Sequence, residues 1–294
     1  MITLSTRPFL KWPGGKYRLI DNITRALGAP VNATGSNRLI EPFVGSGAVF
    51  LNTRYERYLL GDSNPDLINL FNALRTEREL FIEQCASLFI AGNNNAIRYY
   101  ALRREFNMQP SPSRKAALFL YLNRHGYNGL CRYNSRGEFN TPFGQISKPY
   151  FPRKEMLRFI EHGNKVTFKQ QDFRRTMLQA RRGDSVYCDP PYVPLSRTAS
   201  FTDYYTDGFD WSQQIRLAET AAHLARRGVH VVISNHETAA ICDLYRQHGA
   251  RLRKLSVRRS ISCNGANRSP VSEVIAVFKP VTIASTDSVR KKLQ

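Results

Sequence analysis

Residues 38–47, RLIEPFVGSG, are the clearest indication of the fold in this chain of 294 residues. The short apolar segment Arg38–Ile40 leads into Glu41-Pro42-Phe43 and then into a turn that carries Gly45 and Gly47. In a doubly wound sheet, the carboxyl ends of the strands form the ligand crevice, and glycines there let the backbone approach a ligand. The helix expected from Ala48 would add unpaired N–H groups. A plain tight turn is the alternative interpretation.

The same strand–helix alternation continues along the chain. Further strands are expected at Tyr58–Leu60, Lys165–Phe168, Ser185–Cys188, Val229–Ser234, Leu252–Val257 and Val271–Phe278. Helices are expected at 48–53, 66–73, 211–227 and 238–245. Repeated β-α-β units predict an α/β fold with a doubly wound, mostly parallel sheet. The last two strands have no clear helix between them, so we expect them to pair antiparallel at the edge.

A helical block interrupts this alternation. Helices are expected at Glu77–Phe89, Ala96–Phe106 and Ser113–Asn123, and an irregular segment rich in Gly, Pro and Arg follows over 125–151. So long an irregular segment in a compact protein is usually functional. We therefore predict an inserted domain over 75–161 between two parts of the main domain, 1–74 and 162–280. The polar residues 281–294 are expected to be a flexible tail.

The charge balance indicates the kind of partner. The chain has 43 Lys+Arg and 23 Asp+Glu, a formal net charge of +20. Such a surplus favours a polyanionic partner over a basic surface that serves only solubility. We expect neither a membrane span nor a secretory signal, and the five cysteines are expected to be reduced thiols of a cytoplasmic protein. The five cysteines are widely spaced without a C-x-x-C pair, so no metal site is predicted.

Two acidic strand ends point to chemistry. Asp62 follows the second predicted strand, where a carboxylate accepts hydrogen bonds from ribose hydroxyls, so a nucleoside-bearing cofactor is favoured. The string Tyr187-Cys188-Asp189-Pro190-Pro191-Tyr192 follows another strand, and its prolines stiffen the loop. Acceptors at Asp189 and at the Pro190 carbonyl, with the ring of Tyr192, suit a planar substrate bearing an exocyclic amino group. A rigid surface turn is the alternative.

With these blocks in order, the chain resembles the DNA adenine-N6 methyltransferases, and most closely the Dam family, which methylates adenine in GATC. The likeness runs from about Phe9 to Pro280. It is carried by the blocks FLKWPGGK (9–16), EPFVGSGAVFLN (41–52), YLNRHGYNGLCRYNSRGEFNTPF (121–143), YCDPPY (187–192), ISNH (233–236) and RRSISCNG (258–265). It implies a catalytic domain that binds S-adenosylmethionine and an inserted DNA-recognition domain with a β-hairpin loop.

The resemblance also implies roles for individual residues. Cofactor contacts are expected at Trp12, Lys16, Phe43, Gly45, Gly47, Asp62, Asp172, Phe173 and Asp189. Catalytic roles fall to Asp189, Pro190 and Tyr192, which would hold and stack the amino-bearing base. DNA contacts are expected at Lys11, Tyr127, Asn128, Leu130, Arg132 and Pro142. Within this set, Lys11 would contact the outer guanine and Arg132 would make a bidentate contact to a guanine.

The sequence therefore predicts a site-specific methyltransferase that acts on adenine N6 in duplex DNA, within GATC, after flipping the base out of the stack. We expect the chain to act as a monomer. Two alternatives stay open at this point. The first is the same fold acting on cytosine N4 or on RNA, because DPPY suits amino groups in general. The second is a DNA-binding regulator without catalysis.

Overall fold

The computed structural model describes residues 5–28, 37–162, 165–192, 209–257 and 271–281. Its strands are hydrogen-bonded in the order β3-β2-β1-β4-β5-β7-β6. Strand β7 is antiparallel to both of its neighbours, β5 and β6, whereas the β1–β4, β2–β3 and β4–β5 pairs are parallel. The predicted fold class, a mostly parallel sheet with an antiparallel edge, is therefore confirmed. The block 258–265 and residues 282–294 of the predicted tail lie outside the described residues.

The chain divides into two compact units. The first unit combines Met1–Arg25 with Glu41–Thr176, and the second combines Ala26–Ile40 with Met177–Gln294. The predicted inserted segment, 75–161, lies wholly within the first unit. Its boundaries as a separate recognition domain stay a prediction. Within the described residues, no helix is long and apolar enough to cross a membrane.

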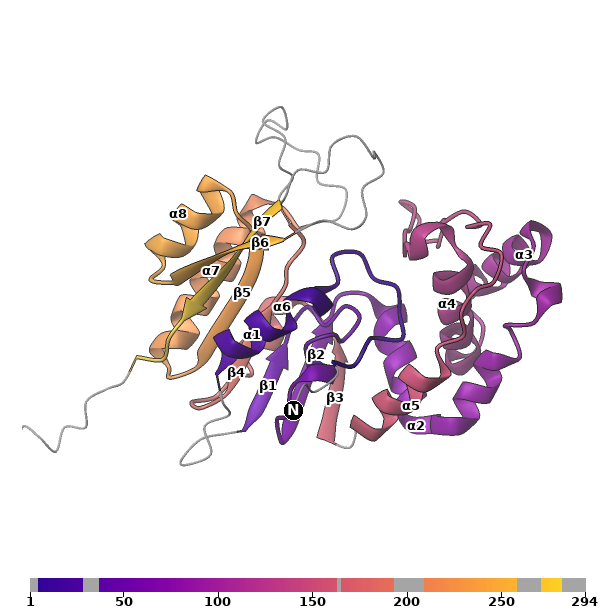
Figure 1. Ribbon diagram of the computed structural model, residues 1–294, viewed down its shortest axis with the longest axis horizontal. Coiled ribbons are helices and arrows are strands. Elements are labelled where there is room, and N and C mark those ends of the chain that lie inside the picture. Colours follow the sequence, from indigo (N-terminus) through magenta and orange to yellow (C-terminus); the bar gives the residue numbers. More distant parts are fainter. Residues whose placement is uncertain (1–4, 29–36, 163–164, 193–208, 258–270, 282–294) are drawn as a thin grey trace, which may run out of the picture. The chain divides into compact units, whose positions relative to one another are not determined.

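The first unit pairs two parallel strands with a group of helices (Figure 1). Its elements are η1 (Lys16–Leu19), η2 (Phe50–Asn52), β2 (Arg57–Asp62), α2 (Pro65–Ala86), η3 (Ala91–Asn93), α3 (Ala96–Asn107), α4 (Pro112–His125), η4 (Tyr127–Gly129), α5 (Arg153–His162) and β3 (Val166–Gln170). The helices α1 (Ile20–Leu27) and α6 (Phe173–Met177) cross the boundary between the units. Strands β2 and β3 run in register from Tyr58 opposite Val166 to Asp62 opposite Gln170.

Aromatic side chains form much of the core of this unit. Phe159 of α5 stacks on Phe71 of α2 with 5.2 Å between ring centroids, and Phe9 meets both rings edge-on. Phe50 of η2 packs edge-on against Tyr58 of β2. Helix α4 is buried without interruption from Ala116 to His125 and packs against α2. This helix ends directly before the irregular segment and gives it a rigid base.

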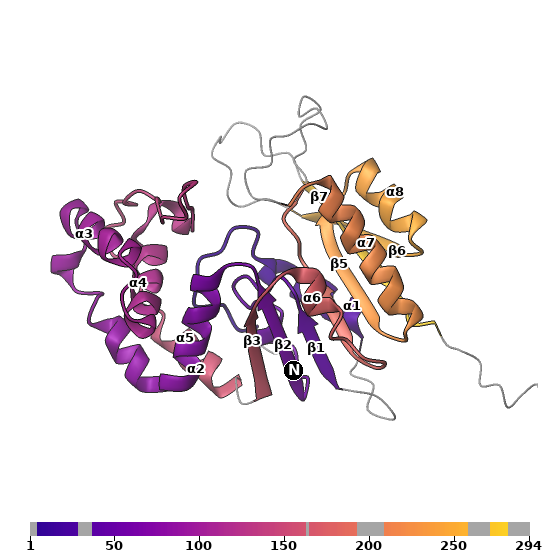
Figure 2. The ribbon, with the colours of Figure 1, turned by 180° about the vertical axis from the view of Figure 1, so that it is seen from behind.

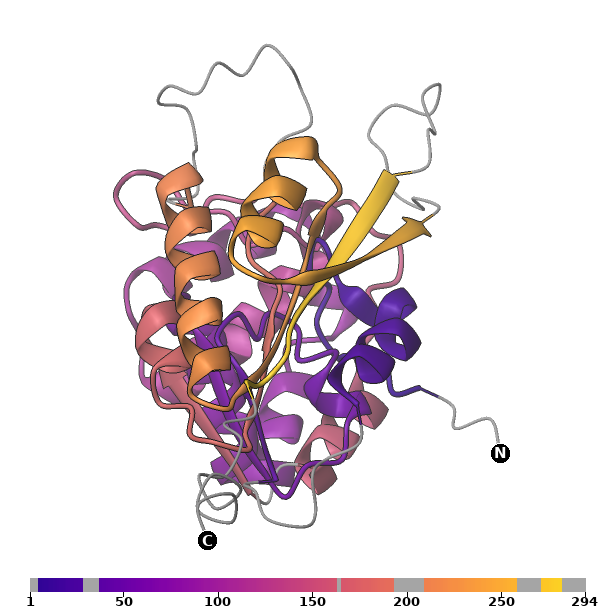
Figure 3. The same cartoon turned by 90° about the vertical axis from the view of Figure 1, so that its left-hand side faces the viewer.

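The second unit contains the remaining strands and two helices, of 16 and 9 residues (Figure 2). Its elements are β1 (Arg38–Glu41, of which Glu41 is assigned to the first unit), β4 (Ser185–Cys188), α7 (Trp211–Arg226), β5 (His230–His236), α8 (Ala239–Gln247), β6 (Arg251–Val257) and β7 (Val271–Phe278). Residues Val231–Asn235 of β5 are all buried, as expected for a strand covered on both faces. Helices α7 and α8 lie beside each other and pack against β5 and β6 (Figure 3).

Some predicted helices differ from the observed ones. The helices expected at 66–73 and 77–89 are merged into α2, whose backbone leaves the helical region at Arg78 (φ 52°, ψ −124°). The helix expected after the Gly turn is only the 3-10 turn η2. Helix α5 was not predicted. Its apolar residues Met156, Phe159 and Ile160 are buried, but a ten-residue helix beside an irregular segment gives a weak periodic signal.

Candidate functional site

The Gly turn of the first unit is built around two left-handed residues. Gly45 has φ +48° and Gly47 has φ +74°, a region that favours glycine. The Val44 N–H donates to the Gly61 carbonyl (2.9 Å), which ties the turn to β2. A Cβ atom on Gly45 would lie 3.0 Å from Nε1 of Trp12. Glycine is therefore needed here both for the backbone conformation and because the indole lies against the turn.

Asp62 connects the same turn to the end of β2. Its Oδ2 accepts from the Gly45 N–H (3.1 Å), and its Oδ1 accepts from the Asn64 N–H (3.0 Å). Burial raises the pKa of this carboxyl, and the backbone N–H bonds from Asn64, Gly45 and Ser63 act in the opposite direction. A carboxylate has about four lone-pair positions. Asp62 therefore has the capacity to accept from ligand hydroxyls as well as from the turn.

Four further residues predicted to hold the cofactor make contacts within the first unit: Lys16, Phe43, Asp172 and Phe173. The buried Lys16 donates from Nζ to the Gly14 carbonyl (2.7 Å), so its ammonium is held within its own turn. The rings of Phe43 and Phe173 stack with 5.3 Å between centroids and 21° between planes. The exposed Asp172 caps α6, because its Oδ1 accepts from the N–H groups of Arg174 and Arg175. The aromatic pair is therefore the better candidate for a wall beside a planar ligand.

The DPPY loop belongs to the second unit. Ser234 of β5 donates from Oγ to Oδ1 of Asp189 (3.0 Å) and shares a hydrogen bond with the hydroxyl of Tyr187 (2.8 Å). The hydroxyl of Tyr192 donates to Oε2 of Glu273 on β7 (3.2 Å). Burial, and next the charge of Asp189, raises the pKa of Tyr192, so the phenol stays neutral. Asp189 and Tyr192 are thus both oriented by side chains of neighbouring strands.

Two buried amide side chains, those of Gln214 and Asn235, hold the backbone of the DPPY loop at Pro191. Gln214 of α7 donates from Nε2 to the Pro191 carbonyl (3.0 Å). Asn235 of β5 donates from Nδ2 to Oε1 of Gln214 (3.1 Å) and lies 2.9 Å from the hydroxyl of Tyr245. Both amides are fully buried. No site role was predicted for Gln214, Ser234 or Asn235, although Ser234 and Asn235 lie in the ISNH block that carries the family resemblance.

The irregular segment of the first unit folds back on itself between residues 126 and 143. Two isolated antiparallel bridges, Gly126 with Phe143 and Tyr133 with Phe139, hold its two sides together. The Tyr133 hydroxyl donates to Oδ2 of Asp66 (2.8 Å), whose Oδ1 is paired with Lys115 (2.7 Å). The side chain of Tyr133 therefore anchors this segment on Asp66 of α2, which is in turn paired with Lys115 of α4. We call residues 126–143 the recognition segment.

The predicted DNA-contacting side chains of the recognition segment point outward. Tyr127, Asn128, Arg132 and Pro142 are exposed, and Leu130 is half-buried. Arg132 donates from Nε to Oδ1 of Asn140 (2.8 Å) within the segment itself. The half-buried Lys11 has its pKa lowered by burial and by the nearby charge of Arg124. These exposed side chains suit contact with a large ligand.

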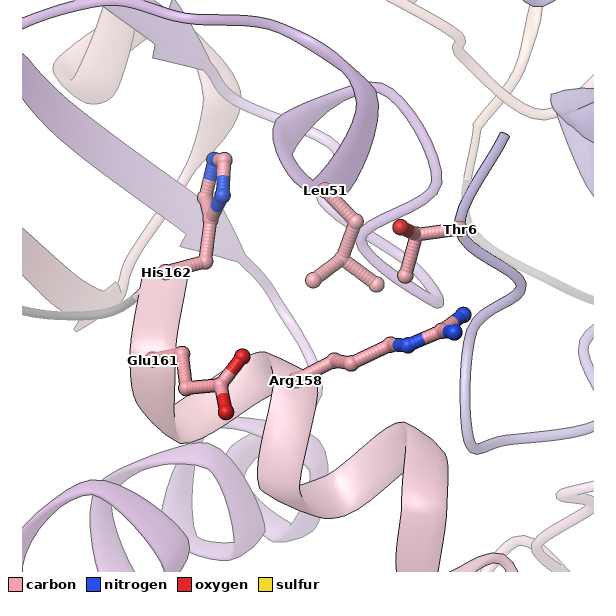
Figure 4. A pocket seen from close by; sticks show the side chains of 5 residues that line it. All are labelled: Thr6, Leu51, Arg158, Glu161 and His162. Atoms are coloured by element: carbon pink, nitrogen blue, oxygen red, sulfur yellow. The ribbon is translucent and has the colours of Figure 1, made fainter. Parts of the chain in front are cut away.

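A separate hollow of about 310 Å³ lies elsewhere in the first unit. Thr6 and Leu51 line it together with three residues of α5, Arg158, Glu161 and His162 (Figure 4). None of the predicted site residues lines this hollow, and it contains one basic and one acidic side chain. Over the part of the chain that the structure describes, no cluster of His, Cys, Asp or Glu is arranged to hold a metal ion.

Comparison with known proteins gives a family for this arrangement. The model of the D12 class N6 adenine-specific DNA methyltransferases matches residues 12–261. A protein named DNA adenine methylase from Escherichia coli (strain K12) is 48% identical over 278 residues, which cover 95% of this chain and 97% of that protein. A DNA adenine methylase from Serratia marcescens is 50% identical over 93% of this chain and 98% of that protein. Among solved structures, the rRNA methyltransferase aviRa from Streptomyces viridochromogenes aligns with a TM-score of 0.39 at 13% identity, over 93% of this chain and 89% of that one.

Proposed function

The chain belongs to the D12 class N6 adenine-specific DNA methyltransferases, and from this premise we propose that it transfers a methyl group from S-adenosylmethionine to adenine N6 in duplex DNA, within GATC. The family and the named relatives act on adenine in DNA. They favour this target over cytosine N4 or RNA, and they favour an enzyme over a regulator without catalysis. Family membership does not itself specify the GATC sequence, the cofactor or base flipping, and we propose these three in addition.

The residues present fit the cofactor. Asp62 is a half-buried carboxylate that is already oriented by two backbone N–H groups, as an acceptor for ribose hydroxyls requires. The half-buried ring of Phe43, stacked on the buried Phe173, is the candidate to contact a planar base, and Trp12 lies against Gly45 at the turn. When bound, S-adenosylmethionine supplies a methyl group on a positively charged sulfur, which makes the methyl electrophilic.

The DPPY loop supplies what the target nitrogen needs. Adenine N6 is a poor nucleophile because its lone pair is delocalised into the ring. Hydrogen bonds from its two amino hydrogens to Asp189 and to the Pro190 carbonyl draw the nitrogen toward tetrahedral geometry, which frees the lone pair. Ser234 fixes Oδ1 of Asp189, so this acceptor is oriented before the base arrives. Positioning of the two reactants then supplies a large share of the rate.

A base inside a duplex is out of reach of such a loop, so the proposal includes flipping the adenine out of the stack at a cost of a few kcal/mol. Tyr192, neutral and held by Glu273, stacks on the flipped base. Tyr127 and Asn128, at the exposed turn of the recognition segment, act at the site that the base has left. Arg132 and Lys11 read guanines through the major groove.

The surplus of basic side chains fits the same partner, because Lys and Arg attract the phosphate backbone. All predicted cofactor, base and DNA contacts belong to one chain. We therefore propose that it works as a monomer, in the cytoplasm where the DNA lies.

One observation carries the proposal most directly: Ser234, Gln214 and Glu273 hold Asp189, Pro191 and Tyr192 as an oriented set of acceptors and a ring. The test is transfer of radioactive methyl from S-adenosylmethionine to duplexes with and without one GATC, followed by digestion to nucleosides. We expect N6-methyladenine from the GATC duplex alone. Equal labelling of both duplexes would reject the GATC assignment, and label on cytosine would reject the target base.

A further inference from the structure

The buried amide of Asn123, on α4, joins two segments that are far apart in the sequence. Its Oδ1 accepts from the Lys11 N–H (3.0 Å), and its Nδ2 donates to the Lys11 carbonyl (2.7 Å) and to the Gly129 carbonyl (2.9 Å). The side chain is fully buried. One primary amide therefore brackets the backbone of Lys11 on both sides and also holds the turn at Gly129.

The two joined segments touch directly. A Cβ atom on Gly129, where φ is +69°, would lie 2.4 Å from Cβ of Lys11 and 2.7 Å from its Cδ. Glycine at this position allows the stem of Lys11 to lie against the turn. Tyr127 and Asn128 precede Gly129 in the same turn, η4, and both are exposed. If Lys11 moved, its position relative to the turn that presents Tyr127 and Asn128 would therefore change.

We propose that Asn123 is a positioning residue for sequence choice: it fixes the backbone of Lys11 and of the Tyr127–Gly129 turn relative to each other, so that the outer guanine is read in register with the flipped adenine. This inference rests on the proposed function. Asn123 has no exposed surface and acts through Lys11 and Gly129. Its amide is required because binding both the N–H and the C=O of one residue needs an acceptor and a donor on one side chain.

The chain contains a matched control for this role. Asn107, at the end of α3, brackets the backbone of Phe139 in the same way: its Oδ1 accepts from the Phe139 N–H (2.9 Å) and its Nδ2 donates to the Phe139 carbonyl (3.1 Å). Phe139 belongs to the recognition segment but is buried. Asn107 therefore shares the chemistry and the segment with Asn123 and lacks the link to Lys11.

The test compares Asn123→Asp with Asn107→Asp in the full chain. Each variant retains the shape of the side chain and an acceptor and loses the Nδ2 donor. Methyl transfer is measured as kcat/KM on a GATC duplex and on one whose outer G·C pair is replaced by A·T. We expect Asn123→Asp to reduce the ratio of these two values about tenfold, by misplacing a contact whose discrimination is of that order or larger. Asn107→Asp is expected to change the ratio by less than about twofold.

A double variant separates positioning from general damage. If Asn123 acts through Lys11, Asn123→Asp combined with Lys11→Ala has the same ratio as Lys11→Ala alone, because coupled residues are not additive. Additive effects, or an equal loss on both duplexes, would overturn the inference. Cofactor affinity and melting temperature are measured for every variant: we expect cofactor affinity to remain close to wild type, and Asn123→Asp to melt at a lower temperature, because its buried carboxyl group faces two carbonyls that have lost their donor.

If Asn123→Asp fails to fold, Gly129→Ala carries the test, because its methyl group presses on Lys11 from the other side of the same contact. The same loss of ratio supports the inference, and an unchanged ratio overturns it. The assay of the wild-type enzyme distinguishes a failure of the Asn123 role from a failure of the proposed function. Wild-type enzyme that methylates GATC while its variants retain the ratio rejects only the role of Asn123, whereas wild-type enzyme that does not methylate GATC rejects the proposed function and this inference together.

Discussion

The DPPY loop and the recognition segment are both irregular, but they are held in different ways. In the DPPY loop, buried side chains orient the functional groups themselves: Ser234 contacts the carboxylate of Asp189, and Glu273 contacts the hydroxyl of Tyr192. In the recognition segment, the buried amide of Asn123 and the half-buried amide of Asn107 hold backbone groups, and the side chains expected to read DNA point outward.

This difference follows from what each region does in the proposed reaction. The amino group must meet acceptors that are already in place, since reorganisation during the reaction costs rate. Base-reading side chains must instead adjust to a duplex whose groove changes shape as it is bound. Substitutions in the DPPY loop should therefore affect the rate of transfer, and substitutions in the recognition segment should affect the choice of sequence.

The largest effect is expected from Asp189→Ala. Loss of the oriented acceptor should reduce kcat on GATC duplexes by about 10³-fold or more. Asp189→Asn is the matched variant: it retains the shape of the side chain and an oxygen for Ser234, but its amide NH2 is a donor where the amino group needs an acceptor, so we expect a loss of similar size. Single-turnover methyl transfer with saturating cofactor measures both variants. Substantial turnover by Asp189→Ala would remove the distinction between the two regions.

The next effect is on stability, and it concerns His125 at the end of α4, the helix that precedes the recognition segment. Burial lowers the pKa of His125, at the end of α4, from 6.5 to about 4. The ring stabilises the fold fully above pH 6.5, and this contribution is lost as the pH falls from 6.5 toward 4, because the unfolded chain binds the proton more readily. The loss should reach about 3 kcal/mol of unfolding free energy.

Urea unfolding of wild type and His125→Gln between pH 7 and pH 4 measures this contribution. The pH dependence in that interval should be smaller in His125→Gln than in wild type. Substitution of the exposed His223 by Gln should leave it unchanged. Equal slopes in all three proteins would contradict the buried, neutral state of His125.

Arg132→Ala tests sequence choice directly. Loss of a bidentate contact to guanine should cost about 1–3 kcal/mol in kcat/KM and relax the choice at that one position. Arg136→Ala, at an exposed arginine of the same segment, should leave the choice unchanged. The measurement is kcat/KM on a set of duplexes with single-base changes in GATC. Uniform weakening on all duplexes would instead indicate that Arg132 contacts phosphate.

The smallest effect is expected from Asp62→Asn. An amide oxygen retains part of the acceptor capacity, so cofactor affinity should weaken about tenfold. Burial raises the pKa of Asp62, so in wild type the affinity should decline as the pH falls through a value above the ordinary 3.8, where the carboxylate becomes protonated. Calorimetric titration with cofactor at several pH values should show this decline in wild type and a flatter profile in the variant.

Much of the sheet was predictable because apolar, β-branched runs such as Val229–Ser234 are short and bounded by turns. The Gly turn was predictable because glycine is the residue that most readily adopts positive φ, and Gly45 and Gly47 both do so. The long helix α2 was predicted as two helices. Its backbone does leave the helical region at Arg78, but the chain resumes the helix, and local periodicity does not report such a resumption.

The sequence by itself determined the fold class and the family, because both are carried by residue types in a fixed order along the chain. It also marked Asp62, Asp189 and Arg132 as candidates, since each belongs to a local motif. The tertiary structure alone assigned Asn123, Gln214 and Glu273, whose partners are 112, 23 and 81 residues away. Their positions depend on helix packing and strand register, which bring distant peptide groups within hydrogen-bond distance and which no local pattern of residues encodes.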